Sequence, residues 1–114
     1  MNRNKTITGI YKVPRQAPET RTIPNTLEAL QELVDGDIET LTVTTDCVFV
    51  LNAAGKLQGM EPNFYFCGDV FVGPVFICSI AGEDFSDLTL SENNRKFLLA
   101  SIRSNDCFGI PYQI

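Results

Sequence analysis

The sequence predicts an α+β fold in which a mainly antiparallel sheet carries two helices on one face. Three observations lead to this class. An amphipathic helical pattern at 25–36 lies between two extended segments, a continuous apolar run follows at 47–51, and a second helical pattern begins at 89. Strands and helices do not alternate regularly, which favours antiparallel pairing over a parallel sheet with crossover helices.

The first extended segments are residues 6–13 and 19–23. Gly9 inside the first of them indicates either a bulge or a close backbone approach. Pro14 and Pro18 force a bend, after which the second segment continues the first strand or pairs with it.

The first helix has recognisable signals at both ends. Asn25 is a suitable N-cap, and Glu28 stands three residues later to return the hydrogen bond. Gly36 fits the left-handed position that ends a helix. The apolar residues recur at helical spacing and form one stripe: Leu27, Leu30, Leu33 and Val34.

Further strands are predicted between the two helices. Residues 38–44 alternate as in a half-buried strand, and 47–51 are apolar throughout, as in a central strand. Residues 57–66 contain Gly59 and Pro62 and are expected to be irregular. Residues 70–80 are strongly β-prone, but a Gly-Pro pair interrupts them with a bulge, an edge or a kink.

The C-terminal part is predicted as a loop, a helix and a docked tail. After a loop at 81–87, Thr89 and Glu92 form a second capping box, and the helix ends near 104–105. Its apolar face comprises Leu90, Phe97, Leu98 and Ile102. The tail at 106–114 is too apolar to remain in water, so it docks on its own domain or on a second copy, and we expect a homodimer.

The composition is that of a single globular domain spanning residues 1–114. Of the 114 residues, 44% are hydrophobic, and the net charge is −5. An acidic protein is poorly suited to direct nucleic-acid binding, which needs Lys and Arg. The charge is compatible with a partner that has a basic surface, and ordinary solubility charge is the alternative. The acidic face expected for this purpose comprises Asp35, Asp37, Glu39, Glu83, Asp84 and Asp87.

The sequence contains no combination of residues that indicates catalysis. With no histidine, no Ser-His or Cys-His pair exists, and the four cysteines lack metal-binding spacing. We therefore expect a non-enzymatic protein without metal or cofactor. No signal peptide or membrane span is visible, so we expect a cytoplasmic protein with reduced thiols.

Two groups of residues are candidates for binding. A cationic cluster in the first bend, with nearby rings and an amide, could hold a nucleotide, although a solvated strand end is the alternative. This ligand site would comprise Tyr11, Lys12, Arg15, Arg21, Asn63 and Tyr65. An aromatic triplet and the tail could form a protein interface, with a local satellite core as the alternative for the triplet. That interface would comprise Phe64, Tyr65, Phe66, Phe108, Ile110 and Tyr112.

Most of residues 10–90 resembles a domain of unknown function (3846) found in phages and mobile elements of Gram-positive gut bacteria. The matching residues are Pro14, Pro18, Ile23, Asn25, Leu27, Leu30, Gln31, Gly36, Ile38, Glu39, Gly55, Lys56, Pro62 and Asn63. Asp35 and Asp37 depart from the family pattern, and the tail after Ser104 lies outside it. The resemblance implies a mobile-element setting and no activity.

Three functions follow as hypotheses. The first is a non-catalytic interaction protein that inhibits a host defence or regulatory machine. The second is a small-ligand binder or sponge for a nucleotide signal. The third is a structural or regulatory accessory domain without a ligand.

Overall fold

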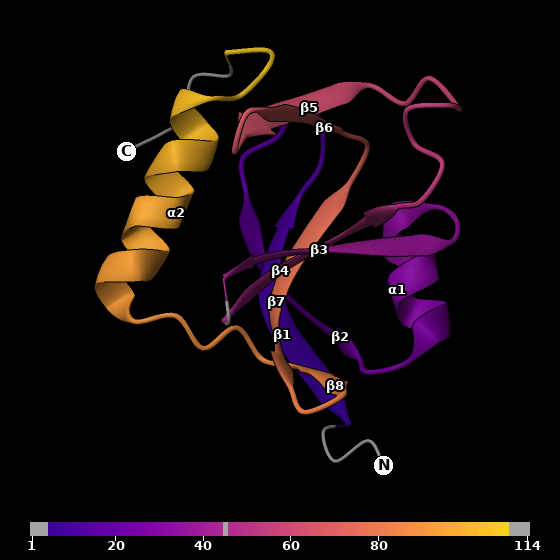
Figure 1. Ribbon diagram of the computed structural model, residues 1–114, viewed down its shortest axis with the longest axis vertical. Coiled ribbons are helices and arrows are strands. Elements are labelled where there is room, and N and C mark those ends of the chain that lie inside the picture. Colours follow the sequence, from indigo (N-terminus) through magenta and orange to yellow (C-terminus); the bar gives the residue numbers. More distant parts are fainter. Residues whose placement is uncertain (1–4, 45, 110–114) are drawn as a thin grey trace.

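The computed structural model describes residues 5–44 and 46–109, and its centre is an antiparallel sheet of six strands (Figure 1). The strand order is β2 (Glu19–Pro24), β1 (Thr6–Lys12), β7 (Val75–Ala81), β4 (Cys47–Asn52) and β3 (Ile38–Thr44), and β8 (Asp84–Ser86) pairs with β7. The remaining elements are the hairpin of β5 (Pro62–Phe66) and β6 (Asp69–Val72), and the helices α1 (Leu27–Val34) and α2 (Glu92–Ser104). The predicted α+β class with a mainly antiparallel sheet is confirmed.

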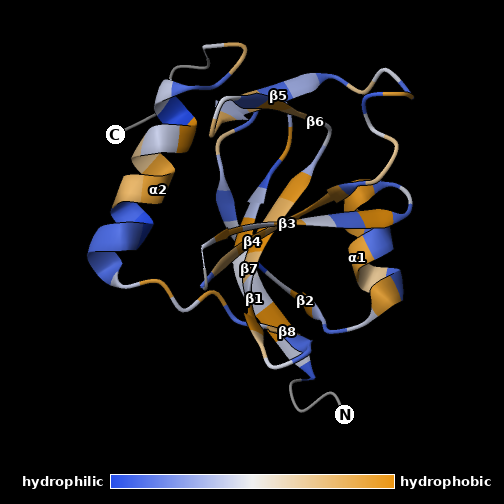
Figure 2. Ribbon diagram, viewed as in Figure 1, coloured by the Kyte–Doolittle hydropathy of each residue, from blue (hydrophilic) through white to orange (hydrophobic). Residues whose placement is uncertain are grey.

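The two helices lie on opposite faces of the sheet, not on one face as predicted (Figure 1). Leu30 and Val34 of α1 pack with Val50 and Phe76 on one face. On the other face the α2 side chains share a cluster with the alternate residues of the same strands: Leu98, Ile102, Phe49 and Ile77. The reason is the composition of β4 and β7, which are apolar on both sides (Figure 2) and so need cover on both.

The hairpin β5–β6 completes the core on the α2 side. The rings of Phe64, Phe66 and Phe71 surround Phe49, with centroids 5.2–5.9 Å from it. Residues 62–66, which the sequence predicted to be irregular, form a strand here. Pro62 is tolerated because it begins the strand.

The Gly73-Pro74 pair separates two strands instead of distorting one. It stands between β6 and β7, so the chain leaves the small hairpin there and enters the large sheet. Gly73 has φ 70°, and a Cβ at this position would meet the sulfur of Met60. The pair is thus a turn that needs glycine.

Both helix N-caps differ from the predicted ones by one or two residues. Thr26 caps α1 by accepting a hydrogen bond from the Ala29 amide, while the Asn25 side chain donates to the Phe85 carbonyl. Ser91 caps α2, and Thr89 instead hydrogen-bonds Ser79.

Two other local predictions are corrected. The αL residue that ends α1 is Asp35, with φ 61°, and Gly36 follows it with φ 154°, also a positive value. Part of the expected loop at 81–87 is the strand β8, which forms a hairpin with β7.

Candidate functional site: the trough along β3

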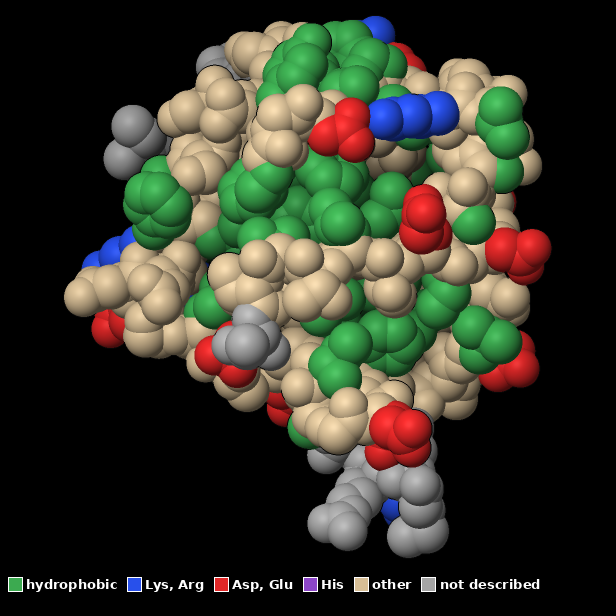
Figure 3. Space-filling model, in the orientation of Figure 1, with side chains coloured by type: hydrophobic (Ala, Val, Ile, Leu, Met, Phe, Trp, Pro, Cys, Tyr) green, Lys and Arg blue, Asp and Glu red, His purple; other side chains and the backbone are tan. Residues whose placement is uncertain are grey.

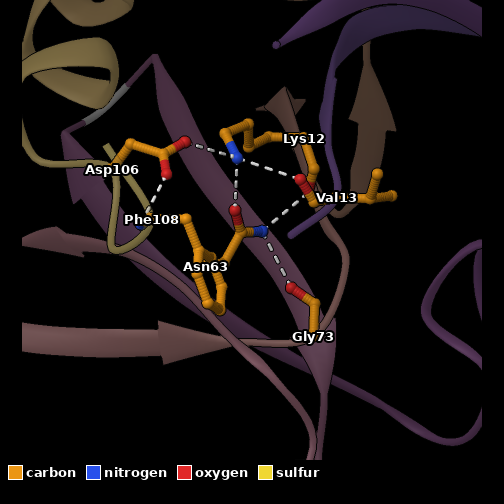
Figure 4. A network of polar contacts seen from close by, with 6 residues as sticks. All are labelled: Lys12, Val13, Asn63, Gly73, Asp106 and Phe108. Carbon is orange, nitrogen blue, oxygen red and sulfur yellow. Dashed lines mark hydrogen bonds and ion pairs between the residues drawn. The ribbon is translucent and has the colours of Figure 1, made fainter. Parts of the chain in front are cut away.

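Two of the six candidate ligand residues, Lys12 and Asn63, form a fully buried polar network with Asp106 (Figure 4). The Lys12 Nζ atom donates to the Val13 carbonyl at 2.9 Å and to Asn63 Oδ1 at 2.7 Å, and lies 3.0 Å from Asp106 Oδ2. Asn63 Nδ2 donates in turn to the carbonyls of Lys12 and Gly73. The three ammonium protons therefore match three acceptors inside the protein.

Arg15 lies beside this network, and its charge is paired with a neighbouring carboxylate. Its Nε donates to Glu61 Oε2 at 2.7 Å, and its guanidinium stacks on the Phe108 ring at 4.0 Å from the centroid. Phe108, a predicted interface residue, is thus half-covered by an arginine of its own chain.

The other candidate ligand residues lie elsewhere. Arg21 pairs with Glu19 and stacks on Tyr11, whose hydroxyl donates to the Leu33 carbonyl. Burial raises the pKa of Tyr11 above its usual value. Tyr65 stands near the end of α2, in a hollow with Ser101 and Asn105. The six residues therefore do not converge, and the nucleotide site stays a prediction.

The predicted aromatic interface is divided between core and surface. Phe64 has no exposed surface and belongs to the core, which excludes it from contact with a partner. Tyr65 is 56% exposed, and Phe66 is half-buried against the core cluster. Ile110 and Tyr112 lie outside the described residues.

Five of the six predicted acidic residues form two groups at the two ends of α1, and the sixth, Asp87, accepts a hydrogen bond from the Thr8 amide. Glu83 and Asp84 line a hollow with Thr26 and Leu27 at its start, whereas Asp35, Asp37 and Glu39 follow its last residue. The two ends of this eight-residue helix are about 12 Å apart. Between Arg21 and Lys56 the chain has six carboxylates and no Lys or Arg, so α1, β3 and β4 belong to one negatively charged segment.

Within this acidic segment, β3 has an unpaired edge. It pairs with β4 on one side, and none of the described strands pairs with it on the other. Its register with β4 is regular from Ile38 to Thr42, before a bulge at 42–44. A regular stretch of five residues therefore keeps backbone groups directed away from the sheet.

Two hollows follow β3 on the face that carries α2 and the β5–β6 hairpin. The first, of about 330 Å³, is bounded by the start of β3, the turn after β4, and β6. The second, of about 410 Å³, is bounded by the end of β3 and by α2. Leu41 lines the first and Val43 the second, on the same strand and about 6.6 Å apart.

The two hollows lie along the same strand, and we call them together the β3 trough. Figure 3 views it directly: hydrophobic side chains gather in a hollow above β3, between α2 and the β5–β6 hairpin. Its principal side chains are Glu39, Leu41, Val43, Leu51, Leu57, Phe66, Phe71, Leu90 and Phe97.

The trough exposes large apolar side chains that no described residue covers. Leu57 is 93% exposed, Phe97 is 73% exposed and Leu41 is 42% exposed. Beside Leu57, Lys56 and Asp69 form an exposed ion pair at 2.9 Å, whose hydrogen bond lowers the pKa of Asp69. Glu39 and Asp46 are both exposed and have no ion pair within the described chain.

The buried thiols are poorly suited to nucleophilic chemistry. Burial raises the pKa of Cys47 to about 11 and that of Cys78 to about 12. Burial also raises the pKa of Cys107. These thiols are therefore protonated at neutral pH, when the thiolate is the reactive form.

Residues 5–44 and 46–109 contain neither a cluster of metal ligands nor a helix suited to crossing a membrane. No group of three Cys, Asp or Glu side chains is arranged to hold a metal ion. Neither α1 nor α2 has the length and apolar composition that a membrane-spanning helix needs.

Sequence reasoning missed the trough, although it placed the strand that borders it. Residues 38–44 were predicted to form a half-buried strand, and their alternation is visible in the sequence. Whether a strand lies at the edge depends on the strand order, which the pattern does not contain. Leu57 and Phe97 resemble ordinary core residues until their exposure is known.

The chain belongs to a family described as a domain of unknown function (DUF3846), which matches residues 7–98. The match includes Lys12 and Asn63 and ends before Asp106. No curated protein and no solved structure matches the chain.

Proposed function

We propose that this protein works by binding another protein through the β3 trough, without catalysing a reaction. The observation that carries the proposal is that three exposed apolar side chains line the β3 trough beside an unpaired strand: Leu41, Leu57 and Phe97. Contiguous apolar surface with a polar rim is typical of protein-binding sites.

The chemistry of the described residues supports a non-catalytic role. Lys12 and Asn63 are fully buried, and their polar atoms form hydrogen bonds within the protein. The buried thiols are protonated at neutral pH. A general base or nucleophile needs a poised and accessible group, and these residues do not supply one.

The resemblance of the sequence to proteins of phages and mobile elements supplies a biological setting. In that setting the partner is a protein in the cytoplasm of a host bacterium. The exposed carboxylates of Glu39 and Asp46 beside the trough favour a partner with a basic surface. Such binding would inhibit a defence or regulatory protein by covering the surface that it uses for nucleic acid.

Photo-crosslinking from within the trough tests the proposal. A photoreactive residue is placed at Phe97, which is exposed enough to be replaced without loss of stability, and the variant is expressed in a bacterial host. We expect one dominant protein adduct. The matched control carries the same group at Leu27, which is 51% exposed on α1, outside the trough.

Two point variants show whether the adduct depends on the trough. The adduct should persist in the Leu27→Ser variant and disappear in Leu57→Ser, when both are crosslinked from Phe97. Equal adducts from both positions, or none from Phe97 across several hosts, would refute binding through the trough.

A further inference from the structure

We infer that the partner supplies an extended segment that pairs with β3 as an additional strand of the sheet. The segment alternates apolar and other residues and carries Lys or Arg near its ends. This inference rests on the proposed function and adds the kind of partner and the mode of binding.

The backbone of β3 is prepared for such pairing. In an antiparallel pair, every second residue directs its N–H and C=O groups away from its neighbour. The regular register with β4 from Ile38 to Thr42 leaves an uninterrupted row of these groups on the outer side. An extended peptide satisfies them by adding a strand, which is a common mode of peptide recognition.

The other edge of the sheet is protected, and β3 is not. The strand β2 carries the Glu19–Arg21 ion pair and ends in Pro24, features that hinder edge-to-edge pairing. In β3, by contrast, Glu39 is the only charged residue among seven, and there is no proline. An unprotected edge rich in β-branched residues indicates a strand that receives a partner.

The trough lies where the side chains of an added strand would point. Residues of β3 that face the trough alternate with those that face away, and Leu41 and Val43 are both on the trough side. A strand paired with β3 directs every second side chain to the same face. Those side chains would enter the trough toward Leu57 and Phe97, which explains the required apolar alternation.

The charge around β3 selects a basic segment over a second copy of this chain. Glu39 and Asp46 stand near the two ends of β3, and both are exposed without an ion pair within the described chain. Two copies paired through β3 would bring two such sets of carboxylates together. Lys or Arg at the ends of the added strand instead meets carboxylates, which favours association and register.

A random peptide display library, with peptides of about twelve residues, is the probe. It is selected on the immobilised full-length chain. We expect enriched peptides with apolar residues at every second position and Lys or Arg near the ends. Their affinity should fall as the salt concentration rises, because part of the attraction is between exposed charges.

Two variants on the same strand provide a matched pair. Leu41→Lys puts a charge on the trough side of β3, and Thr42→Lys puts the same charge on the other side, at exposed positions in both cases. Enriched peptides should bind Leu41→Lys at least about tenfold more weakly than wild type, since an interface anchor is lost. Their affinity for Thr42→Lys should stay within about threefold of that for wild type, because this variant has the same change in charge as Leu41→Lys but leaves the trough intact.

N-methylation of the peptide tests the backbone pairing. One residue at a time is methylated, which removes its N–H without changing its side chain. We expect losses of about tenfold or more at every second residue and small effects between them, since only alternate groups face β3.

Four results would overturn the inference. They are enrichment of peptides with helical spacing, equal binding to Leu41→Lys and Thr42→Lys, a dimer of the wild-type chain that Leu41→Lys dissociates, and the absence of any enriched peptide. If the Phe97 crosslink to a host protein persists in any of these cases, binding through the trough stands and strand addition fails.

Discussion

The Lys12 ammonium lies 3.0 Å from the Asp106 carboxylate, and neither side chain reaches solvent. The pair joins the end of β1 to the chain just after α2. Asp106 Oδ1 also accepts a hydrogen bond from the Phe108 amide, which holds the turn at 106–108 against β5. A buried ion pair contributes little net stability over an apolar pair, but it defines which groups meet. Here it determines where the chain runs after α2.

Removing Asp106 should destabilise the fold strongly. In Asp106→Ala the Lys12 ammonium stays buried without its carboxylate, and we expect a loss of about 3–5 kcal/mol in the free energy of unfolding. Urea denaturation measures it. The matched control is Asp69→Ala, which removes a carboxylate from an exposed ion pair and should leave the urea midpoint nearly unchanged.

A double variant separates charge from packing. Lys12→Met with Asp106→Leu removes both charges and keeps apolar volume, so it should be more stable than Asp106→Ala alone. If the double variant and Asp106→Ala are equally destabilised, the loss of packing dominates and not the uncompensated charge of Lys12.

The sequence identifies two members of this network, but it does not show that they are buried or that Asp106 joins them. The sequence predicts Asn63 and Lys12 as members of one ligand site, and the structure brings them together in the interior. Nothing in the local pattern shows that β5 crosses over the end of β1, so their burial does not follow from the sequence. The role of Asp106 depends on where α2 ends relative to β5, which the local pattern does not contain either.

The fold was more predictable than the site. The period-two pattern of 38–44 and the apolar run at 47–51 predict β3 and β4 because side-chain alternation is a local property. The apolar run also indicated burial on both faces, which requires cover on both and so opposes helices on a single face. The predicted N-cap of α1 was wrong for another reason. Asn25 and Thr26 are both suitable caps, and the hydrogen bond of the Asn25 side chain to the Phe85 carbonyl leaves Thr26 as the cap.

Stability should fall at alkaline pH because of the buried thiols. Folding raises the pKa of Cys47 to about 11 and that of Cys78 to about 12, from 9.0. The contribution of the neutral thiols is fully present below about pH 9 and is lost as the pH rises toward these folded-state values. Urea denaturation at neutral pH and near pH 10 should show the decrease.

The contribution of the thiols can be separated from that of other groups. The pKa of Tyr11 is also raised, so its titration adds a fall of the same sign. A Cys47→Ala/Cys78→Val variant should therefore lose less stability between the two pH values than wild type. An identical pH dependence would rule out the thiols as its cause.

Thiol labelling should distinguish the four cysteines at neutral pH. Cys67 is exposed in the β5–β6 turn and Cys107 is half-buried, whereas Cys47 and Cys78 are buried. An alkylating reagent followed by mass spectrometry should modify Cys67 first and Cys47 and Cys78 only after denaturation. Rapid native labelling of Cys78 would contradict the position of β7 at the centre of the sheet.

Gly9 should be intolerant of a side chain. A Cβ at this position would meet the Ile77 carbonyl oxygen and the Phe76 ring, confirming the close backbone approach predicted for this glycine. Because the obstacle is the backbone of β7, Gly9→Ala should cost about 3 kcal/mol. The control Gly82→Ala has open space around its Cβ and only an unfavourable φ, so it should cost about 1 kcal/mol in the same urea assay.

Two truncations should distinguish the structural part of the C-terminus from any part in association. A chain ending at Gly109 keeps Asp106, the Cys107 amide that bonds Asn63 and the Phe108 ring under Arg15. It should melt at the wild-type temperature. A chain ending at Asn105 loses all three and should melt more than about 10 °C lower, by the argument for Asp106→Ala. The homodimer predicted through Ile110 and Tyr112 would instead make the Gly109 truncation monomeric in light scattering and lower its melting temperature by an amount that depends on protein concentration. If the Asn105 truncation keeps both the wild-type mass and the wild-type melting temperature, the C-terminal segment is neither core nor interface, and the role assigned to the Lys12–Asp106 pair is wrong.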